Sequence, residues 1–216
     1  MKAAIVVIAA SLASGGLSAA APDAAAIVRE GNDKGAPPCI ACHGAHGEGQ
    51  VAGGFPRLAG LDAAYMERQM DDFASGSRDN AVMKPIASAL SKEERRALAR
   101  HYSGLAPPAA SEPAASDELD PQGESIALRG RWEGQVPACV ACHGPSGVGV
   151  GSHFPPLAAQ PAGYIAAQLH AWKDGQRRND PMGMMQHVAS ELDEAEIQAV
   201  AGWFAAQPAM IEEGGP

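Results

Sequence analysis

The stretch Cys39-Ile40-Ala41-Cys42-His43-Gly44 decides the fold of this 216-residue chain, because it returns as Cys139-Val140-Ala141-Cys142-His143-Gly144. The two copies contain all four cysteines of the sequence. Each copy places two thiols one helical turn apart and a histidine directly after the second thiol. The remainder of the chain can be read as a scaffold for these two sites.

C-x-x-C-H is the attachment signature of c-type haem. The two thiols can each form a thioether to a haem vinyl group, and the neighbouring imidazole can then bind the iron. The pattern predicts Cys39, Cys42, Cys139 and Cys142 as the cofactor-binding residues and His43 and His143 as iron ligands. We therefore expect two covalently bound haem c groups in this chain.

Two other uses of paired cysteines fit less well. A zinc ribbon would place its two C-x-x-C pairs about 15 to 20 residues apart, whereas residues 39 and 139 are a hundred positions apart. A thioredoxin-like redox pair would lie in a βαβ context, but here the flanking segments are Gly/Pro loops and helical patterns. Covalent haem remains the leading interpretation.

The first residues have the pattern of an export signal. Met1-Lys2 is followed by an apolar run over residues 3–10 and then by small residues that end in Ala19-Ala20-Ala21. This run is far shorter than the 18 or more residues of a membrane span, so an uncleaved anchor is the weaker alternative. We expect residues 1–21 to be a cleaved signal peptide and the mature protein to be periplasmic, where thioethers to haem are made.

The similarity between the two halves extends well beyond the cysteines. The segment Phe55-Pro56-Arg57-Leu58-Ala59 matches Phe154-Pro155-Pro156-Leu157-Ala158 at an offset of 99, and Met83 matches Met185 at an offset of 102. A period near 100 indicates tandem domains. We expect an N-terminal domain over residues 22–105, a Pro/Ala/Ser-rich linker over 106–119 and a C-terminal domain over 120–216.

Each half repeats one helical pattern of about four helices and long loops. Opening helices are predicted over 23–31 and 120–132, amphipathic helices over 62–75 and 162–174, and closing helices that begin at 91 and 193. The closing helices start with Ser91 and Asp193, each followed three residues later by a glutamate, which is the spacing of a capping box. No useful strand-like alternation occurs, so the predicted fold class is all-α.

The formal net charge of the chain is −9, and most of the excess acid lies in the linker and the second half. This balance argues against a nucleic-acid partner, which would require a basic patch. The acidic half could serve as a docking surface for a partner of opposite charge. Ordinary solubilising surface is the alternative for the same residues.

The second axial ligand of each iron is predicted to be a methionine. Met83 and Met185 lie in the loops before the closing helices, each seven residues before a matched leucine, Leu90 or Leu192. A thioether ligand raises the haem potential by favouring the ferrous iron. Met184 is the runner-up in the second half, and Met66 and Met70 read as core residues of a helix. The histidines outside the motifs have no matched counterparts and read as surface or packing residues: His46, His101, His153, His170 and His187.

With these residues placed, the chain resembles class I cytochromes c and, more closely, the dihaem cytochrome c4 family. The resemblance implies two tandem class I cytochrome c-like domains related by a pseudo-twofold axis, with His43 and Met83 on one iron and His143 and Met185 on the other. It also implies that the Pro56 and Pro155 carbonyls accept a hydrogen bond from the ligating imidazoles. Because Pro56 follows its histidine by thirteen residues and Pro155 by twelve, the Phe55 carbonyl is an alternative. Candidates for contacting haem propionates are Tyr65, Tyr164, Arg78 and Arg177, with surface roles as the alternative for the arginines.

The resulting functional hypothesis is a periplasmic electron carrier between respiratory-chain proteins, directed toward a terminal oxidase, and not an enzyme. Its partners would be redox proteins such as a membrane-bound cytochrome complex, an oxidase or a dehydrogenase. A cytochrome subunit of a membrane-bound dehydrogenase or oxidase is the first alternative, and a dihaem peroxidase, which needs an open iron site, is the second. Peripheral membrane association and the oligomeric state are left open by the sequence.

Overall fold

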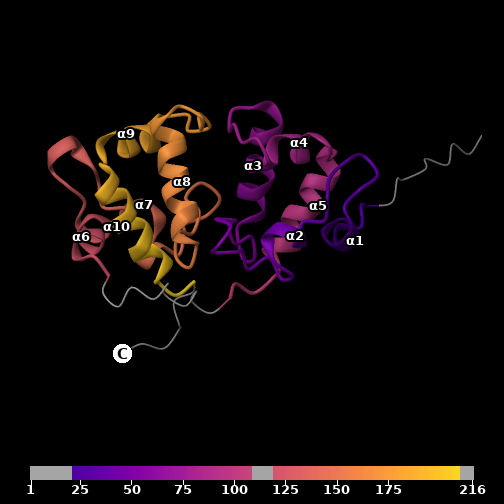
Figure 1. Ribbon diagram of the computed structural model, residues 1–216, viewed down its shortest axis with the longest axis horizontal. Coiled ribbons are helices and arrows are strands. Elements are labelled where there is room, and N and C mark those ends of the chain that lie inside the picture. Colours follow the sequence, from indigo (N-terminus) through magenta and orange to yellow (C-terminus); the bar gives the residue numbers. More distant parts are fainter. Residues whose placement is uncertain (1–20, 109–118, 210–216) are drawn as a thin grey trace, which may run out of the picture.

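The computed structural model describes residues 21–108 and 119–209. Residues 1–20 of the predicted signal peptide and most of the predicted linker lie outside these residues. In the described part the chain forms two helical halves, one from each copy of the repeat, with only isolated β-bridges. Helices α3 and α8 face each other where the halves meet (Figure 1). The all-α, two-domain prediction is confirmed.

The N-terminal half is built from five helices. They are α1 (Ala24–Glu30), α2 (Ile40–His43), α3 (Ala63–Ser75), α4 (Met83–Ser88) and α5 (Lys92–Ser103). Asp23 caps α1 through the Ala26 amide, and Asp62 caps α3 through the Tyr65 amide. Ser91 and Glu94 form the predicted capping box at the start of α5.

The C-terminal half repeats this order. Its elements are α6 (Pro121–Arg129), the 3-10 turn η1 (Glu133–Gln135), α7 (Val140–His143), the 3-10 turn η2 (Pro145–Gly147), α8 (Ala162–Lys173), α9 (Met184–Glu191) and α10 (Glu194–Ala205). Asp193 and Glu196 form the second predicted capping box. The opening helix ends at Arg129, earlier than predicted, because the next residue, Gly130, has a φ of 70° and its amide closes the last turn on Ile126.

Two short helices in each half were not predicted as such. The C-x-x-C-H segments form the four-residue helices α2 and α7, and the methionine segments form α4 and α9. The prediction that Met83 and Met185 lie in loops was therefore wrong: Met83 is the first residue of α4, and Met185 is the second residue of α9. These helices are too short to show a hydrophobic period in the sequence.

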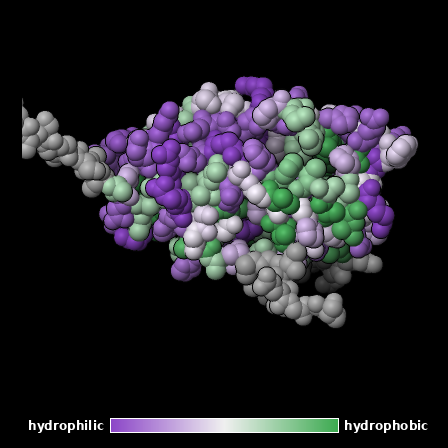
Figure 2. Space-filling model, turned by 180° about the vertical axis from the view of Figure 1, so that it is seen from behind, coloured by the Kyte–Doolittle hydropathy of each residue, from purple (hydrophilic) through white to green (hydrophobic). Residues whose placement is uncertain are grey.

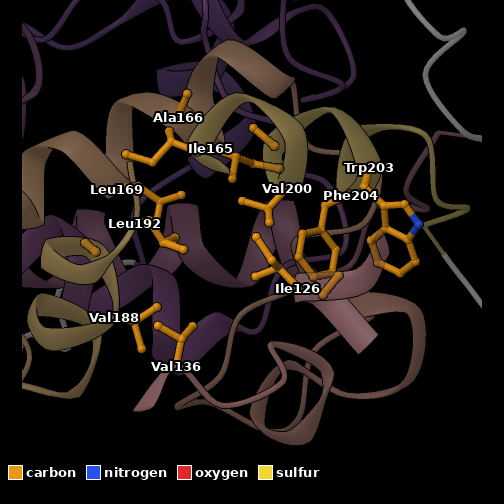
Figure 3. Close-up of a cluster of buried hydrophobic side chains, with 14 residues drawn as sticks. Ile126, Val136, Ile165, Ala166, Leu169, Val188, Leu192, Val200, Trp203 and Phe204 are labelled. Atoms are coloured by element: carbon orange, nitrogen blue, oxygen red, sulfur yellow. The ribbon is translucent and has the colours of Figure 1, made fainter. Parts of the chain in front are cut away.

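The core of each half lies between its opening, amphipathic and closing helices. In the C-terminal half, Ile126 of α6, Leu169 of α8 and Val200 of α10 converge on one cluster (Figure 3). In the N-terminal half, Ile27, Met70 and Leu98 hold the corresponding places. The half-buried cysteines Cys39 and Cys139 pack against these clusters, so each haem attachment segment borders the core.

The two halves meet through hydrogen bonds between matched residues. The Asp79 amide donates to the Gln176 carbonyl at 2.8 Å, and the Arg178 amide donates to the Ser77 carbonyl at 2.7 Å. Residues 77 and 79 match residues 176 and 178, and the bonds flank an antiparallel bridge between Arg78 and Arg177. Each of these two bonds becomes the other when the matched residues of the two halves are exchanged. A pseudo-twofold axis therefore passes between Arg78 and Arg177.

A second contact between the halves breaks this symmetry. The Arg57 amide donates to Gln160 Oε1, and Gln160 Nε2 donates to the Arg57 carbonyl, both at 3.0 Å. The Arg57 guanidinium, which is 1% exposed, donates to the matched carbonyls of Ala59 and Ala158. Position 156, which matches Arg57, is a proline.

The surfaces of the halves differ in character. Seen from behind, hydrophobic residues gather over the C-terminal half, whereas the N-terminal half is mostly hydrophilic (Figure 2). The closing helices reflect this difference, since α5 has the sequence KEERRALARHYS and α10 has EAEIQAVAGWFA. Within residues 21–108 and 119–209, no helix combines the length and apolar character needed to cross a membrane.

Candidate haem sites

Each C-x-x-C-H segment is a single helical turn that ends at its histidine. The backbone bonds of α2 run from the Cys42 and His43 amides to the Cys39 carbonyl, and α7 has the same arrangement. Gly44 and Gly144 follow with φ values of 84° and 78°, which turn the chain away directly after each histidine. All four cysteines are half-buried, and none of them forms a disulfide. This conformation leaves both thiols of each pair available for thioether bonds.

Each motif histidine is buried and held by one backbone carbonyl. His43 Nδ1 lies 3.0 Å from the Pro56 oxygen, and His143 Nδ1 lies 2.8 Å from the Pro155 oxygen. A carbonyl can only accept, so Nδ1 must carry the proton, and Nε2 remains free to bind a metal. The expected Pro56 contact is confirmed over its Phe55 alternative. The extra residue of the first half is absorbed between bridged residues Gln50 and Phe55, a turn that is one residue shorter between Val150 and Phe154.

Burial sets the protonation of these groups. Burial lowers the pKa of His43 and His143, so the imidazoles are neutral at neutral pH, which is the form that binds iron. Burial also raises the pKa of the Cys139 thiol to about 11. Before haem is attached, this thiol is therefore protonated and only weakly nucleophilic on its own.

A cavity opens beside each motif and brings the predicted site residues together. The first cavity, of about 410 Å³, is lined by Cys39, Cys42, His43, Pro56 and Met83. The second, of about 760 Å³, is lined by Cys139, Cys142, His143, Pro155 and Met185. Both volumes fall in the range of sites for bound small molecules and cofactors. All eight residues predicted from the sequence thus line a cavity of their own half.

The methionine segments are held in matching ways. The Met83 amide donates to Asn80 Oδ1 at 2.8 Å, and the Met185 amide donates to the Asp180 carboxylate. Met185 is half-buried and packs against the C-terminal core, whereas Met184 is 38% exposed. Met184 also lines the second cavity, as Met66 and Met70 line the first. Burial and the match to Met83 favour Met185 over its neighbour.

The unmatched histidines are mostly remote from the cavities. His153 lines the second cavity but is exposed, while His170 pairs with Glu194 on the surface and His187 bonds the Gly134 carbonyl. In the described part of the chain, no group of three or more His, Cys, Asp or Glu side chains could hold a metal ion. A tetrahedral zinc site therefore lacks a set of ligands there.

Arg78 and Arg177 lie in the interface beside the cavities, and their predicted alternative role as surface residues was wrong. Each is 5% exposed, and both line the first cavity, while Arg177 also lines the second. Arg78 donates to Gln69 at 2.9 Å and Tyr164 at 2.8 Å, and Arg177 makes the matched bonds to Gln168 and Tyr65 at 3.1 and 3.4 Å. Each guanidinium also covers an aromatic ring, Phe73 in one half and Trp172 in the other.

Neither arginine of this pair forms an ion pair with a carboxylate among the described residues. Asp72 acts on the charge of Arg78 only from beyond ion-pair distance. Burial, and then repulsion from Arg78, lower the pKa of Arg177. A buried pair of cations next to two cavities calls for an anionic partner, because unpaired buried charge is costly.

Two buried polar atoms in the cavity linings also lack a nitrogen or oxygen partner among the described residues. They are the Tyr102 hydroxyl, from a residue that lines the first cavity, and Trp172 Nε1, from a residue that lines the second. The cavities are otherwise lined mainly by apolar side chains. Apolar walls, paired thiols, a neutral imidazole and cationic groups near one edge fit a porphyrin, whose flat body is apolar and whose propionates are anionic.

Comparison with known proteins agrees with this fit. The Cytochrome c family matches residues 35–106 and again residues 135–206. The chain is 51% identical over 167 residues to the thiosulfate dehydrogenase electron acceptor of Stutzerimonas stutzeri strain A1501, covering 77% of both chains.

Two solved structures show the same arrangement of helices. Thiosulfate dehydrogenase TsdBA from Marichromatium purpuratum matches 86% of this chain with a TM-score of 0.80 and 42% identity, and this chain spans only 40% of that longer protein. Reduced recombinant cytochrome c4 from Pseudomonas stutzeri matches 78% of this chain, and 93% of its own length, with a TM-score of 0.70 and 31% identity. With its two attachment motifs and two cavities, the chain belongs to the dihaem cytochrome c4 family and carries two covalently bound haem c groups.

Proposed function

We propose that this protein is an electron carrier whose two haems are each closed by a histidine and a methionine. The observation that carries this proposal is the presence of a matched methionine in each cavity together with the motif histidine: Met83 with His43, and Met185 with His143. Two protein ligands leave the iron no open position for a substrate. The protein then changes iron valence and makes no bond in a substrate, unlike a peroxidase.

The thioethers in this proposal come from Cys39, Cys42, Cys139 and Cys142. The free Nε2 atoms of His43 and His143 bind the two irons, while the proline carbonyls hold the rings in position. Haem supplies the redox centre, and the chain supplies ligands, an apolar enclosure and the surrounding charges. The domain limits of 22–105 and 120–216 give each haem its own half.

We further propose that Arg78 and Arg177 are the cationic partners of the haem propionates, with Tyr65 and Tyr164 as supporting groups. The arginines lie between the cavities and have no carboxylate partner among the described residues. Propionates from both haems would supply the missing negative charge. This would hold the propionate edges of both haems at the pseudo-twofold interface. Electrons would then cross only a short distance between the haems.

For the electron donor, we propose a periplasmic dehydrogenase that oxidises thiosulfate. The relative in Stutzerimonas stutzeri is named as the electron acceptor of such an enzyme, and TsdBA contains a similar region within a thiosulfate dehydrogenase. A respiratory carrier directed toward a terminal oxidase is the second candidate, supported by the likeness to cytochrome c4 over nearly its whole length. The two roles are compatible, since a carrier needs both a donor and an acceptor.

Turnover with purified partners tests these roles. Thiosulfate and a catalytic amount of thiosulfate dehydrogenase should reduce both haems, as followed by absorbance, with no reduction when enzyme or thiosulfate is omitted. A terminal oxidase should then reoxidise the protein. Failure of reduction by active dehydrogenase, with normal reduction by dithionite, would exclude the proposed donor.

A permanent subunit and a free carrier differ in how they hold their partner. A transient electron-transfer encounter buries a small interface and is sensitive to salt, whereas a subunit stays bound. Purification from the native host at high salt should yield the cytochrome alone if it is a free carrier, and a stable large complex if it is a subunit.

Export to the periplasm belongs to the same proposal. Residues 1–21 would then be absent from the mature protein.

A further inference from the structure

Tyr102 and Phe204 occupy the same place in the two halves. A Cβ atom added to Gly47 would lie 2.7 Å from the Tyr102 ring, and one added to Gly147 would lie 2.6 Å from the Phe204 ring. The backbone is matched as well, because the Tyr102 carbonyl accepts from Gly60 at 3.0 Å and the Phe204 carbonyl accepts from Ala159 at 3.1 Å. The two rings therefore pack in equivalent positions, and the side chains differ by one hydroxyl group.

That hydroxyl is buried beside the first haem attachment segment. Tyr102 is 3% exposed and lines the first cavity, and its oxygen has no nitrogen or oxygen partner among the described residues. Burial raises the pKa of the Cys39 thiol, and contact with the Tyr102 hydroxyl lowers it. Cys39 is one of the two residues that hold the haem of this half. A hydroxyl donor without a nitrogen or oxygen partner therefore lies beside a haem attachment residue.

We propose that the Tyr102 hydroxyl sets the potential of the N-terminal haem by donating toward the Cys39 side of that haem, with no counterpart at the C-terminal haem. A hydroxyl proton carries partial positive charge. When the haem takes up one electron, this charge stabilises the added electron, and in the apolar enclosure the effect is weakly screened. The inference rests on haems bound in these two cavities, as described above, and it makes Tyr102 a positioning and tuning residue that binds no substrate.

Other differences between the halves act on the same potentials. Glu48, whose charge also acts on the Tyr102 hydroxyl, is matched by Val148, and Phe73 is matched by Trp172. A carboxylate near a haem opposes reduction, whereas an indole N–H favours it. The Tyr102 hydroxyl is the member of this set that can be removed or added with one atom and no change of ring, so its effect can be measured separately.

The test is an exchange of the two side chains in the full-length holoprotein. The variants are Tyr102→Phe, Phe204→Tyr and the double exchange, and the potential of each haem is followed by redox titration with the haem methyl resonances assigned by NMR. We expect Tyr102→Phe to lower the potential of the N-terminal haem alone and Phe204→Tyr to raise that of the C-terminal haem alone. The typical net strength of a hydrogen bond corresponds to a change of roughly two- to tenfold in the equilibrium constant for electron exchange between the haems.

Both single variants must be examined, because each tests the inference in a different half. If Tyr102→Phe folds poorly, Phe204→Tyr decides, since it adds a hydroxyl to the C-terminal half and leaves the N-terminal half unchanged. Unchanged potentials in correctly loaded variants, or equal shifts at both haems, would overturn the inference. Haem content and the sulfur-to-iron charge-transfer band are recorded on the same samples. Absence of the charge-transfer band from the unmodified protein would instead refute the methionine ligation.

Discussion

His43 and His143 owe their orientation to one carbonyl each. The contacts of 3.0 and 2.8 Å to Pro56 and Pro155 select the tautomer that protonates Nδ1. Because proline has no backbone N–H and a fixed φ, the carbonyl is presented by a stiff segment. Small differences between these contacts would change how strongly the two imidazoles donate to their irons.

Removal of either methionine should open one iron site. Met83→Ala and Met185→Ala should each abolish the sulfur-to-iron charge-transfer band of one haem and lower the potential of that haem, because the thioether favours ferrous iron. Optical spectroscopy of the oxidised protein and redox titration measure both effects.

Met184→Ala is the matched control for this pair. Its side chain is 38% exposed next to the half-buried Met185, so its loss should leave both bands in place. If Met184→Ala removed a band and Met185→Ala did not, the assigned ligand of the C-terminal haem would be wrong.

Binding of carbon monoxide tests whether both irons of the unmodified protein lack an open coordination position. With a histidine and a methionine on each iron, carbon monoxide should bind slowly or barely to the reduced protein, since it must displace a ligand. The Met83→Ala and Met185→Ala variants should each bind about one equivalent rapidly by flash photolysis or rapid mixing. Rapid binding at one haem of the native protein would favour a peroxidase-type site.

The helices show which elements the sequence could predict. Helices α3, α5, α8 and α10 were predicted because each is long enough to repeat an apolar face, and α5 and α10 also have capping boxes. The short helices α4 and α9 were missed because six and eight residues hold at most two turns. The sequence still placed Met83 and Met185 correctly in the repeat, since matching the halves required no knowledge of their conformation.

Gly123 shows how closely two elements approach. A Cβ atom at this position of α6 would lie 2.2 Å from the Ala199 carbonyl oxygen of α10, whereas the matched residue of α1 is Ala24. Gly123→Ala should therefore reduce the free energy of unfolding by about 2 kcal/mol through overpacking. Chemical denaturation of the oxidised holoprotein provides the measurement.

Gly202→Ala in α10 is the control, because nothing lies within 4 Å of its added Cβ. It should be neutral or raise the free energy of unfolding by up to about 1 kcal/mol, as alanine is the better helix former. Equal destabilisation by both substitutions would contradict the proposed close contact between α6 and α10.

At the scale of the whole molecule, the interface was the part that sequence reasoning could not reach. The exchange of hydrogen bonds around Arg78 and Arg177 joins residues about a hundred positions apart. Both arginines were named as candidates for contacting haem propionates, but a single sequence does not reveal which residues of the two halves face each other. The twofold relation expected from the family resemblance became visible only through these contacts.

Gln160 should couple the stability of the two halves. Its buried side chain makes two bonds of 3.0 Å with the backbone of Arg57, so Gln160→Ala leaves a buried amide and carbonyl without partners. We expect a loss of about 2 kcal/mol in the free energy of unfolding. The two haem sites should also unfold at more widely separated denaturant concentrations when followed by absorbance.

The exposed Gln198 serves for comparison, since its side chain bonds only Glu194 one turn earlier among the described contacts. Gln198→Ala should change the free energy of unfolding by less than about 0.5 kcal/mol. A similar effect of the two substitutions would mean that Gln160 does not link the halves.

Arg57 makes the interface between the two halves asymmetric. Its one guanidinium donates to both members of a matched pair of carbonyls, Ala59 and Ala158. In a symmetric assembly, each of these carbonyls would need its own arginine. Two copies of the N-terminal half would bring two buried cations to one axis, and two copies of the C-terminal half, with Pro156 at this position, would bring none. A homodimer of either half would therefore need a different set of side chains at this axis.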